Sequence, residues 1–466
     1  MPECDICGKE FDSKDSLKKH KEDRHTSKDN NEDDFSIGLK GKEKKPESTN
    51  ANVSKSSEEI SIDVDRVIPF LKKYGPVIAL IVIFSFSYWT RVTGFFNPNT
   101  GEERWPYLRN IDSYWYKQLI DLTIENGGVT PGEGRRIAYN NDLDNHSPYV
   151  HMSAWAYMAV GSNLGLELWE FLIYWPAFLA ALTVVPLYFI GKYLYDKKAG
   201  VLAALFVGIS PILISRTLGG DPDTTSINLL LAMVSFAVFV FAYKKFKTTS
   251  KKSILGFGLV GAALGIFGLN WPPYWYAFWV MLGTVVLKII IDTVVRKAKN
   301  KDLSVILKEV KFYALHFVVL IAVIAIITVP FVGLDRTTGL VSNPLSKVGI
   351  IGKGIKGESG MFPNVYVSVA ELQAGGQLSR VINRSGGVMF WLGMLSILYL
   401  IPVYFLKEKH LDTALFILIW VGGLTFATVV AIRFASILTP ALVVGSSIIL
   451  SKLINWGIGN HKKLLE

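Results

Sequence analysis

The sequence predicts an all-α polytopic membrane protein with about ten or more transmembrane helices, preceded by a small ββα zinc finger. Three observations support this fold class. Half of the 466 residues are hydrophobic, and they gather into long runs instead of alternating with polar residues. Lysine and arginine cluster after every second run. Two cysteines and two histidines near the N-terminus have the spacing of a zinc site.

Hydrophobic runs of about the length of a membrane span recur along the chain. A helix needs roughly 20 apolar residues to cross a bilayer. The candidate runs lie near 76–90, 168–191, 199–216, 224–243, 253–270, 273–293, 313–333, 387–406, 411–431 and 434–452. The stretch 149–162 is short and begins next to Pro148 and His151, so we expect an interfacial helix there and not a span. The first 64 residues are polar and charged, which predicts that there is no cleavable signal peptide.

The distribution of lysine and arginine predicts the orientation of these spans. Lys72 and Lys73 precede the first run, and other basic residues follow the second, fourth, sixth, eighth and tenth runs. Because cytoplasmic connections are enriched in lysine and arginine, the N-terminus and these connections are predicted to be cytoplasmic. The formal net charge of +10 therefore indicates orientation more than nucleic-acid binding. Three segments then face outward, namely 91–167, 217–223 and 334–386.

Composition divides the chain into four parts. They are a zinc finger at 1–28, a disordered linker at 29–64, a transmembrane domain at 65–453 and a cytoplasmic tail at 454–466. The linker is rich in Ser, Asn, Asp, Glu and Lys, and it has too few apolar groups to form a core. We expect the protein in a plasma membrane or an ER-type membrane, with its N-terminus in the cytoplasm.

The N-terminal part carries the pattern of a C2H2 zinc finger. Two thiolates on a hairpin and two imidazoles on one helical face suit tetrahedral zinc, and the alternative is a pair of unused thiols in a disordered tail. The predicted zinc ligands are Cys4, Cys7, His20 and His25. One finger reads only about three base pairs. A cytosolic protein partner is therefore favoured over DNA.

The Gly-Gly-Asp-Pro-Asp stretch at 219–223 places two carboxylates at the predicted outer end of an apolar run. Charge near hydrocarbon is costly, so it is typical of sites for metals, substrates or protons. Carboxylates at positions i and i+2 can bind one hard cation such as Mg²⁺ or Mn²⁺. The alternative is helix capping, because Asp223 or Thr224 can accept the N–H groups that open the next span. Capping does not account for Asp221.

Four other charged or titratable residues in the outward segments have two interpretations each. Asp112 lies among aromatic residues, which suits an amphiphilic substrate or an interfacial aromatic belt with a solvated aspartate. His146 is a candidate metal ligand or a turn residue, and alone the turn is favoured. Glu371 lies in a glycine-rich segment that could open and close over a site, or it is a solvated glutamate. Arg433 could hold a phosphate or extend to the interface.

These segments together resemble the catalytic subunit of oligosaccharyltransferase, the STT3/AglB/PglB family with the GT-C glycosyltransferase fold. The resemblance covers about residues 76–452. The matching segments are Asp112-Ser113-Tyr114, Asn145 to Pro148, Ser215-Arg216 leading into Gly-Gly-Asp-x-Asp, Ser368 to Glu371, and Arg433-Phe434 with Pro440. Each motif is weak alone, but their order and their shared side of the membrane make the set specific.

The resemblance implies a glycosyltransferase that moves a glycan from a polyprenyl-(pyro)phosphate lipid to an acceptor such as a protein asparagine, with inversion at the anomeric carbon. Asp112, Asp221 and Asp223 would ligate Mn²⁺ or Mg²⁺, which neutralises the leaving phosphate. Asp112 and Glu371 would hydrogen-bond the acceptor amide. The implied substrate-binding residues are His146, Arg216 and Arg433, with Arg433 at the lipid phosphate. The implied partners are a lipid-linked oligosaccharide, an acceptor polypeptide and membrane lipids.

The sequence departs from this family pattern in two places. The pattern continues into an external C-terminal domain whose Trp-Trp-Asp-Tyr-Gly motif reads the acceptor sequon, and the sequence to Glu466 has no such motif. We therefore expect that a second chain supplies that domain, that the acceptor differs, or that the protein is an inactive paralogue. An N-terminal zinc finger is also outside the pattern.

Three alternative functions stay open. The first is another GT-C enzyme that uses a polyprenyl-phosphate sugar on a different acceptor. The second is a non-catalytic membrane scaffold whose zinc finger docks a partner. A transporter is disfavoured, because its charges should lie in the middle of the membrane.

Overall fold

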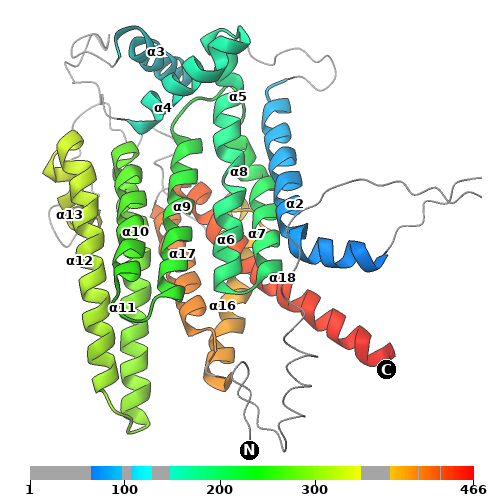
Figure 1. The fold of residues 1–466 in the computed structure, drawn as a ribbon, viewed down its shortest axis with the longest axis vertical. Coiled ribbons are helices and arrows are strands. Elements are labelled where there is room, and N and C mark those ends of the chain that lie inside the picture. Colours follow the sequence, from blue (N-terminus) through cyan, green and yellow to red (C-terminus); the bar gives the residue numbers. More distant parts are fainter. Residues whose placement is uncertain are drawn as a thin grey trace, which may run out of the picture. The chain divides into compact units, whose positions relative to one another are not determined.

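The computed structural model describes residues 64–96, 107–127, 147–347, 378–407, 409–430 and 432–465. The chain divides into two compact units, Met1–Ile62 and Asp63–Glu466. The first unit lies outside the described residues, so the predicted zinc finger and most of the predicted linker lie outside them as well. The second unit consists, in its described part, of helices and the connections between them (Figure 1).

The described helices follow one another along the chain in this order. The first half of the described chain contains α2 (Val64–Thr93), α3 (Ile111–Asn126), α4 (Pro148–Ala156), η1 (Tyr157–Gly161), η2 (Ser162–Leu164), α5 (Leu168–Ala181), α6 (Val184–Leu194), α7 (Lys197–Ile209), α8 (Pro211–Arg216) and α9 (Thr225–Lys245). The second half contains α10 (Lys251–Asn270), η3 (Pro272–Tyr274), α11 (Trp275–Ala298), α12 (Ser304–Val332), α13 (Leu334–Lys347), α15 (Leu378–Arg384), α16 (Val388–Lys407), α17 (Leu411–Val430), η5 (Ile432–Phe434) and α18 (Ala435–Leu465).

Nine helical segments in the described chain are long and apolar enough to cross a membrane. They are Lys73–Thr93, Leu168–Leu194, Thr225–Lys245, Lys251–Asn270, Pro272–Ala298, Ser304–Val332, Val388–Leu406, Leu411–Val429 and Ala435–Ile458. Each coincides with one of the runs predicted from hydropathy. The predicted class, an all-α membrane protein with many spans, is therefore confirmed for the described residues.

The remaining predicted run, 199–216, is divided into two helices and is not among the candidate spans. The helix α7 ends at Ile209 and α8 begins at Pro211. Between them Ser210 is extended, with φ −61° and ψ 115°. The cause is Pro211, because a proline ring disfavours the helical conformation of the residue before it and provides no N–H group. The short α8 then leads into the Gly-Gly-Asp-Pro-Asp stretch.

Short helices gather at one end of the span bundle. In Figure 1, α3 and α4 lie near the start of α5 at this end. They pack on α5 through a small apolar cluster that includes Ile120, Ala154 and Leu172. The stretch 149–162, expected not to span, is covered by α4, η1 and part of η2, and no candidate span of the described chain includes it.

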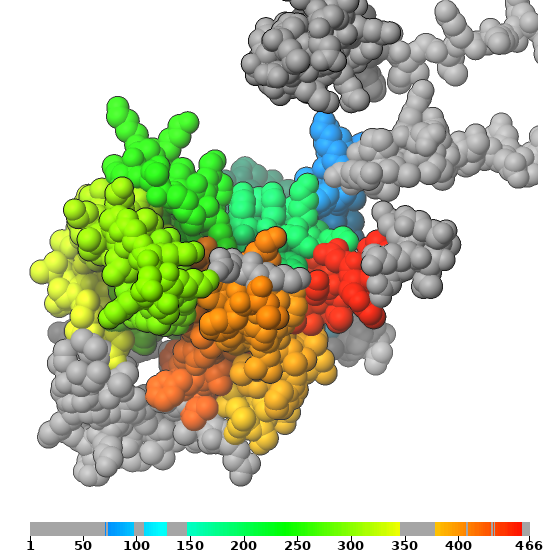
Figure 2. Space-filling view, turned by 90° about the horizontal axis from the view of Figure 1, so that it is seen from below, coloured from blue at the N-terminus to red at the C-terminus, as the bar shows by residue number. Residues whose placement is uncertain are grey.

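Glycines allow close contact between neighbouring spans. A Cβ atom on Gly261 of α10 would lie 2.6 Å from the carbonyl oxygen of Leu320 in α12. A Cβ atom on Gly191 of α6 would lie 2.8 Å from the carbonyl oxygen of Ala199 in α7. Small residues at such contacts are typical of helix packing in membranes. Seen from the end opposite α3 and α4, α16 and α17 (orange) lie between the yellow-green α12 and the red α18 (Figure 2).

Candidate active site

The acidic loop, defined as residues 219–223, connects α8 to α9 and is hydrogen-bonded through its backbone to three other segments. The N–H groups of its two glycines donate to the carbonyls of Arg91 in α2 and Ile173 in α5, at 3.0 and 3.2 Å. The carbonyl of its second glycine accepts the N–H of Arg109 at 2.8 Å. The fold therefore fixes the backbone from which both loop carboxylates extend.

The two glycines of the acidic loop are required by local geometry. Gly220 has φ +73°, in the left-handed region that favours glycine. A Cβ atom at this position would lie 2.3 Å from the ring of Phe95. A Cβ atom on Gly219 would lie 2.6 Å from the carbonyl oxygen of Ile173. Larger residues would therefore move the loop away from α2 and α5.

Arg91 in α2 is a buried cation behind the acidic loop, with 1% of its surface exposed. Its Nε donates to Oγ1 of Thr217 at 2.9 Å. Its Nη1 donates to the carbonyl and the hydroxyl of Ser87, at 2.9 and 2.6 Å, and to the carbonyl of Gly208 at 3.1 Å. A buried charge is costly unless it is hydrogen-bonded. These contacts provide partners for Nε and Nη1, and they join α2 to α7 and to the residues before the loop.

The carboxylate of Asp221 contacts the segment that surrounds Asp112. Its Oδ1 accepts hydrogen bonds from Nδ2 of Asn110 at 2.5 Å and from Oγ of Ser113 at 3.1 Å. Its Oδ2 lies 3.4 Å from Nη1 of Arg109. Residues on both sides of Asp112 in the sequence thus contact one carboxylate. The two acidic segments singled out from the sequence meet in the fold.

The three carboxylates interact electrostatically. Asp112 is exposed in the first turn of α3. Burial raises the pKa of Asp221, Arg109 opposes this shift, and the charge of Asp112 adds to it. Burial and the charge of Asp221 raise the pKa of Asp223 to about 6, and Asp112 adds to this shift as well. The carboxylates therefore repel one another, and a bound cation would relieve the repulsion.

Asp223 also caps the following span. Its Oδ1 accepts the backbone N–H of Thr225, the first residue of α9. The hydrogen bond expected from the capping interpretation is thus present for Asp223. Asp221 instead contacts the segment before and within α3, so capping does not explain it.

The carboxylates of this site are chemically suited to a divalent cation. The described residues alone do not provide a complete set of metal ligands. Carboxylate oxygens are the ligands that Mg²⁺ and Mn²⁺ prefer, and the mutual repulsion of Asp112, Asp221 and Asp223 favours a cation. Within the described part of the chain, no group of three or more His, Cys, Asp or Glu side chains could hold a metal ion. His146 and Glu371 lie outside the described residues.

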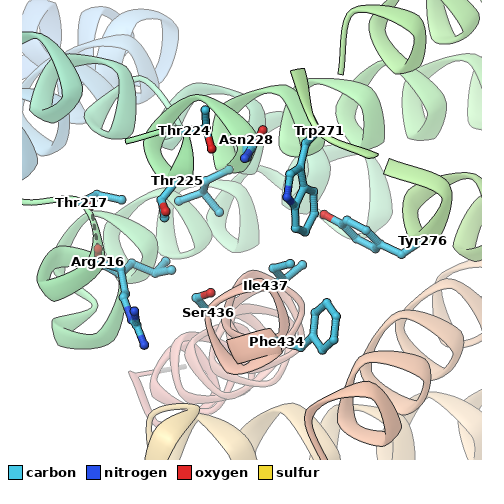
Figure 3. Close-up of a pocket in the computed structure, with 12 residues that line it drawn as sticks. Arg216, Thr217, Thr224, Thr225, Asn228, Trp271, Tyr276, Phe434, Ser436 and Ile437 are labelled. Atoms are coloured by element: carbon cyan, nitrogen blue, oxygen red, sulfur yellow. Dashed lines mark hydrogen bonds between the residues drawn. The ribbon is translucent and has the colours of Figure 1, made fainter. Parts of the chain in front are cut away.

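A cavity of about 250 Å³ adjoins the acidic loop (Figure 3). One side is aromatic, with Trp271, Tyr276 and Phe434. The other walls carry polar groups, and those used below are Arg216, Thr224, Thr225, Asn228 and Ser436. An aromatic face opposite hydroxyl and amide groups can hold a compact ligand that is apolar on one face and polar at its edge.

A chain of amide groups joins this cavity to the turn that opens α4. Nδ2 of Asn270 donates to Oδ1 of Asn228 at 2.6 Å. Oδ1 of Asn270 accepts the hydroxyl of Ser147 at 3.1 Å and the N–H of Tyr149 at 3.2 Å. These bonds fix the orientation of both amides. In Figure 3 the amide nitrogen of Asn228 lies on the cavity side.

The last part of the described chain supplies one wall of the cavity. Phe434 belongs to η5, and Ser436 and Ile437 belong to the first turn of α18. Arg433 lies in η5 next to Phe434, and its side chain is outside the described atoms. The backbone of η5 is therefore at the cavity.

The predicted site residues divide into two groups. The structure brings the segments of Asp112, Asp221 and Asp223 together and places Arg216 in the cavity wall. The predicted residues whose side chains lie outside the described part are His146, Glu371, Arg433, Cys4, Cys7, His20 and His25.

The sequence interpretation missed residues that act through tertiary contacts. Asn110 and Asn270 had no motif to mark them. The charge of Arg91 at the end of an apolar run was an available signal, because buried charges near hydrocarbon are rare.

These features define a class, namely an all-α integral membrane protein with an acidic site and an aromatic-lined cavity at one end of its helices. Comparison with known proteins then identifies its family. The family model described as "Oligosaccharyl transferase STT3, N-terminal" matches residues 77–455. The chain belongs to this family.

Individual relatives are similar over most of this chain. A dolichyl-phosphooligosaccharide-protein glycotransferase of Methanococcus voltae is 22% identical over 383 residues, covering 73% of this chain and 41% of the relative. A protein of the same description from Methanocaldococcus jannaschii is 22% identical over 444 residues, covering 74% of this chain and 46% of the relative. This chain thus spans less than half the length of these curated relatives.

The fold is also that of a solved relative. The structure of the archaeal oligosaccharyltransferase AglB from Archaeoglobus fulgidus, in complex with an inhibitory peptide and a dolichol-phosphate, matches with a TM-score of 0.64 and 19% identity. The match covers 84% of this chain and 52% of that chain. The AglB-like fold expected from the resemblance is therefore confirmed.

Proposed function

We propose that the protein is a membrane glycosyltransferase of the oligosaccharyltransferase type. It would transfer a glycan from a polyprenyl-(pyro)phosphate lipid to an acceptor such as the side-chain amide of a protein asparagine. The observation that carries this proposal is the meeting of the acidic loop with the Asp112 segment beside the aromatic-lined cavity. Membership of the STT3 family supports the same reaction class.

The cavity would hold the sugar-phosphate part of the donor. Sugar rings pack on aromatic faces such as that of Trp271, and their hydroxyl groups hydrogen-bond to amide and hydroxyl side chains such as Asn228 and Thr225. Arginine binds phosphate with charge-assisted hydrogen bonds. Arg216 in the wall and Arg433 in η5 are the candidates for this contact.

The chain's own residues would position both reactants for one inverting displacement. The anomeric carbon loses its bond to the phosphate oxygen and gains a bond to the acceptor nitrogen, which releases one proton. Asp112 and Glu371 would accept hydrogen bonds from the acceptor amide and orient its nitrogen. Mn²⁺ or Mg²⁺, held by Asp112, Asp221 and Asp223, would supply charge neutralisation for the leaving phosphate. His146 would add a substrate contact.

The lysine distribution supports an orientation for this enzyme. The N-terminus would be cytoplasmic and the acidic loop would lie on the outer face of a plasma membrane or an ER-type membrane. At the cytoplasmic end, Zn²⁺ bound by Cys4, Cys7, His20 and His25 would form a structural finger that docks a protein partner.

A transfer assay tests the proposal. Purified protein is combined with polyprenyl-linked glycans, Mn²⁺ and a panel of acceptor peptides, and glycosylated product is measured. Asp223→Ala should lower the rate at least about a hundredfold, because charge neutralisation by a bound metal contributes several kcal/mol. Glu371→Gln should likewise abolish transfer.

A matched control separates the metal role of Asp223 from its capping role. Asp302 also accepts the N–H of the residue two positions on, Ser304, at 2.8 Å, and it is exposed. Asp302→Ala removes the same kind of cap and should leave transfer unchanged. Full activity in Asp223→Ala would contradict the metal role, and a wild-type protein inactive with every donor and acceptor would favour a non-catalytic scaffold.

A further inference from the structure

Asn110 makes hydrogen bonds of opposite polarity at the junction of the two acidic segments. Its Oδ1 accepts the backbone N–H of Ser113 at 3.0 Å, which caps the N-terminus of α3. Its Nδ2 donates to Oδ1 of Asp221 at 2.5 Å. One side chain thus caps the helix that carries Asp112 and holds the carboxylate of the other acidic segment.

We propose that Asn110 is a positioning residue for the cation site. Its two hydrogen bonds connect the first turn of α3, which carries Asp112, to the carboxylate of Asp221. This inference rests on the proposed function, because the cation site belongs to that function. It adds a residue that no motif of the sequence marked.

The chemistry of an amide explains why asparagine stands here. A carboxamide has an acceptor oxygen for the helix cap and a donor nitrogen for the carboxylate. Aspartate would cap α3 equally well, but it would place a second negative charge against Asp221. Serine would also cap the helix, but its hydroxyl is attached closer to the backbone and would not reach Asp221.

The neighbours of Asn110 in the sequence also contact the carboxylate of Asp221. The hydroxyl of Ser113 donates to Oδ1 of Asp221 at 3.1 Å and lies 3.2 Å from Oδ1 of Asn110. Both donors to this oxygen are uncharged, so they orient the carboxylate without adding charge to it. The cationic Arg109 forms an ion pair with the other carboxylate oxygen of Asp221, Oδ2, at 3.4 Å, and it also donates to the carbonyl of Ser215 at 2.9 Å.

Residues that orient metal ligands have measurable effects on affinity. Loss of such a partner typically weakens metal binding by about 10 to 100-fold. A purely structural cap instead raises the melting temperature and leaves metal binding unchanged. The two roles of Asn110 can therefore be separated.

Mn²⁺ binding to the full-length protein in detergent, measured by electron paramagnetic resonance, tests this role. Asn110→Ser keeps a cap on α3 but loses the bond to Asp221, so we expect Mn²⁺ affinity to fall about 10 to 100-fold while thermal stability is nearly unchanged. Asn110→Ala should lose both Mn²⁺ affinity and stability. In the transfer assay, saturating Mn²⁺ should restore most of the rate of Asn110→Ser.

Two further variants make the outcome decisive. Ser250→Ala removes the cap of α10, where Oγ accepts the N–H of Ser253 at 3.1 Å, and it should lower stability without changing Mn²⁺ affinity. Asp221→Asn should abolish Mn²⁺ binding at this site, which distinguishes it from Mn²⁺ bound elsewhere on the protein. Wild-type affinity in Asn110→Ser would overturn the positioning role alone. If the wild type shows no Mn²⁺ binding that Asp221→Asn removes, the cation site itself is wrong, and the role of Asn110 is overturned with it.

Discussion

At the scale of single residues, the acidic loop depends on a backbone conformation that side chains rarely adopt. Gly220 has φ +73° and faces the ring of Phe95. Gly220→Ala should therefore destabilise the protein by about 1–2 kcal/mol from the left-handed conformation alone, and the contact with Phe95 should displace the loop. We expect a lower melting temperature together with a loss of transfer activity.

A second glycine isolates the effect of the contact. Gly127, after α3, has φ +72°, and no described atom lies within 4 Å of a Cβ placed there. Gly127→Ala should share the conformational cost and keep transfer activity. Equal activity losses in the two variants would show that the position of the acidic loop does not limit transfer.

Candidate site residues could be predicted from the sequence where a local motif marked them. Asp221 and Asp223 were predicted because carboxylates are rare at the ends of apolar runs, and Asp112 was predicted because it lies among aromatic residues. The contacts of Arg91 with Thr217 and of Asn110 with Asp221 could not be predicted, because these partners lie 126 and 111 residues away in the sequence. Such pairs form only once the helices are packed.

At the scale of elements, the hydrogen bonds of Asn270 connect the start of α4 to the end of α10 and to Asn228. Asn270→Ala would leave the hydroxyl of Ser147, the N–H of Tyr149 and an oxygen of Asn228 without their present partner. Each buried polar group left unpaired costs about 1–3 kcal/mol. We expect a lower melting temperature and a higher KM for the lipid-linked donor, since Asn228 lines the cavity.

A substitution of an exposed asparagine provides the control for Asn270→Ala. Asn163 donates to the carbonyl of Ala159 at 2.9 Å, and it is exposed. Asn163→Ala should change neither property. An unchanged KM in Asn270→Ala would show that the hydrogen bonds of Asn270 do not shape the cavity proposed to hold the donor.

The break between α7 and α8 shows what hydropathy cannot predict. The run 199–216 is apolar throughout its centre, so its composition indicates one span. The conformation of Ser210 depends on the proline that follows it, which is a local steric effect that a hydropathy average does not contain.

At the scale of the whole molecule, hydropathy was a reliable guide to the spans, because a helix is the one open segment that satisfies its own backbone groups in lipid. Their orientation is still a prediction. It can be tested in a background without Cys4 and Cys7, the two cysteines of the chain. Glu125→Cys, in α3, and Lys301→Cys, between α11 and α12, introduce single thiols at opposite ends of the bundle.

Labelling of these thiols reports the orientation directly. In sealed right-side-out vesicles, an impermeant maleimide should label Glu125→Cys and should not label Lys301→Cys until detergent is added. The reverse pattern would place the acidic loop in the cytoplasm and contradict the lysine-based prediction.

The distribution of the site along the chain has a consequence for biosynthesis. The hydrogen bonds described above for the acidic loop come from residues between Arg91 and Thr225, whereas Phe434 and Ser436 line the cavity from the last described helices. Ribosomes add residues in order, at about 5–20 per second, and early parts of a chain fold first. The nascent protein is therefore expected to assemble its acidic loop before the cavity wall formed by η5 and α18 has been synthesised. Under the proposed function, it would be able to bind a cation before it could bind a donor lipid.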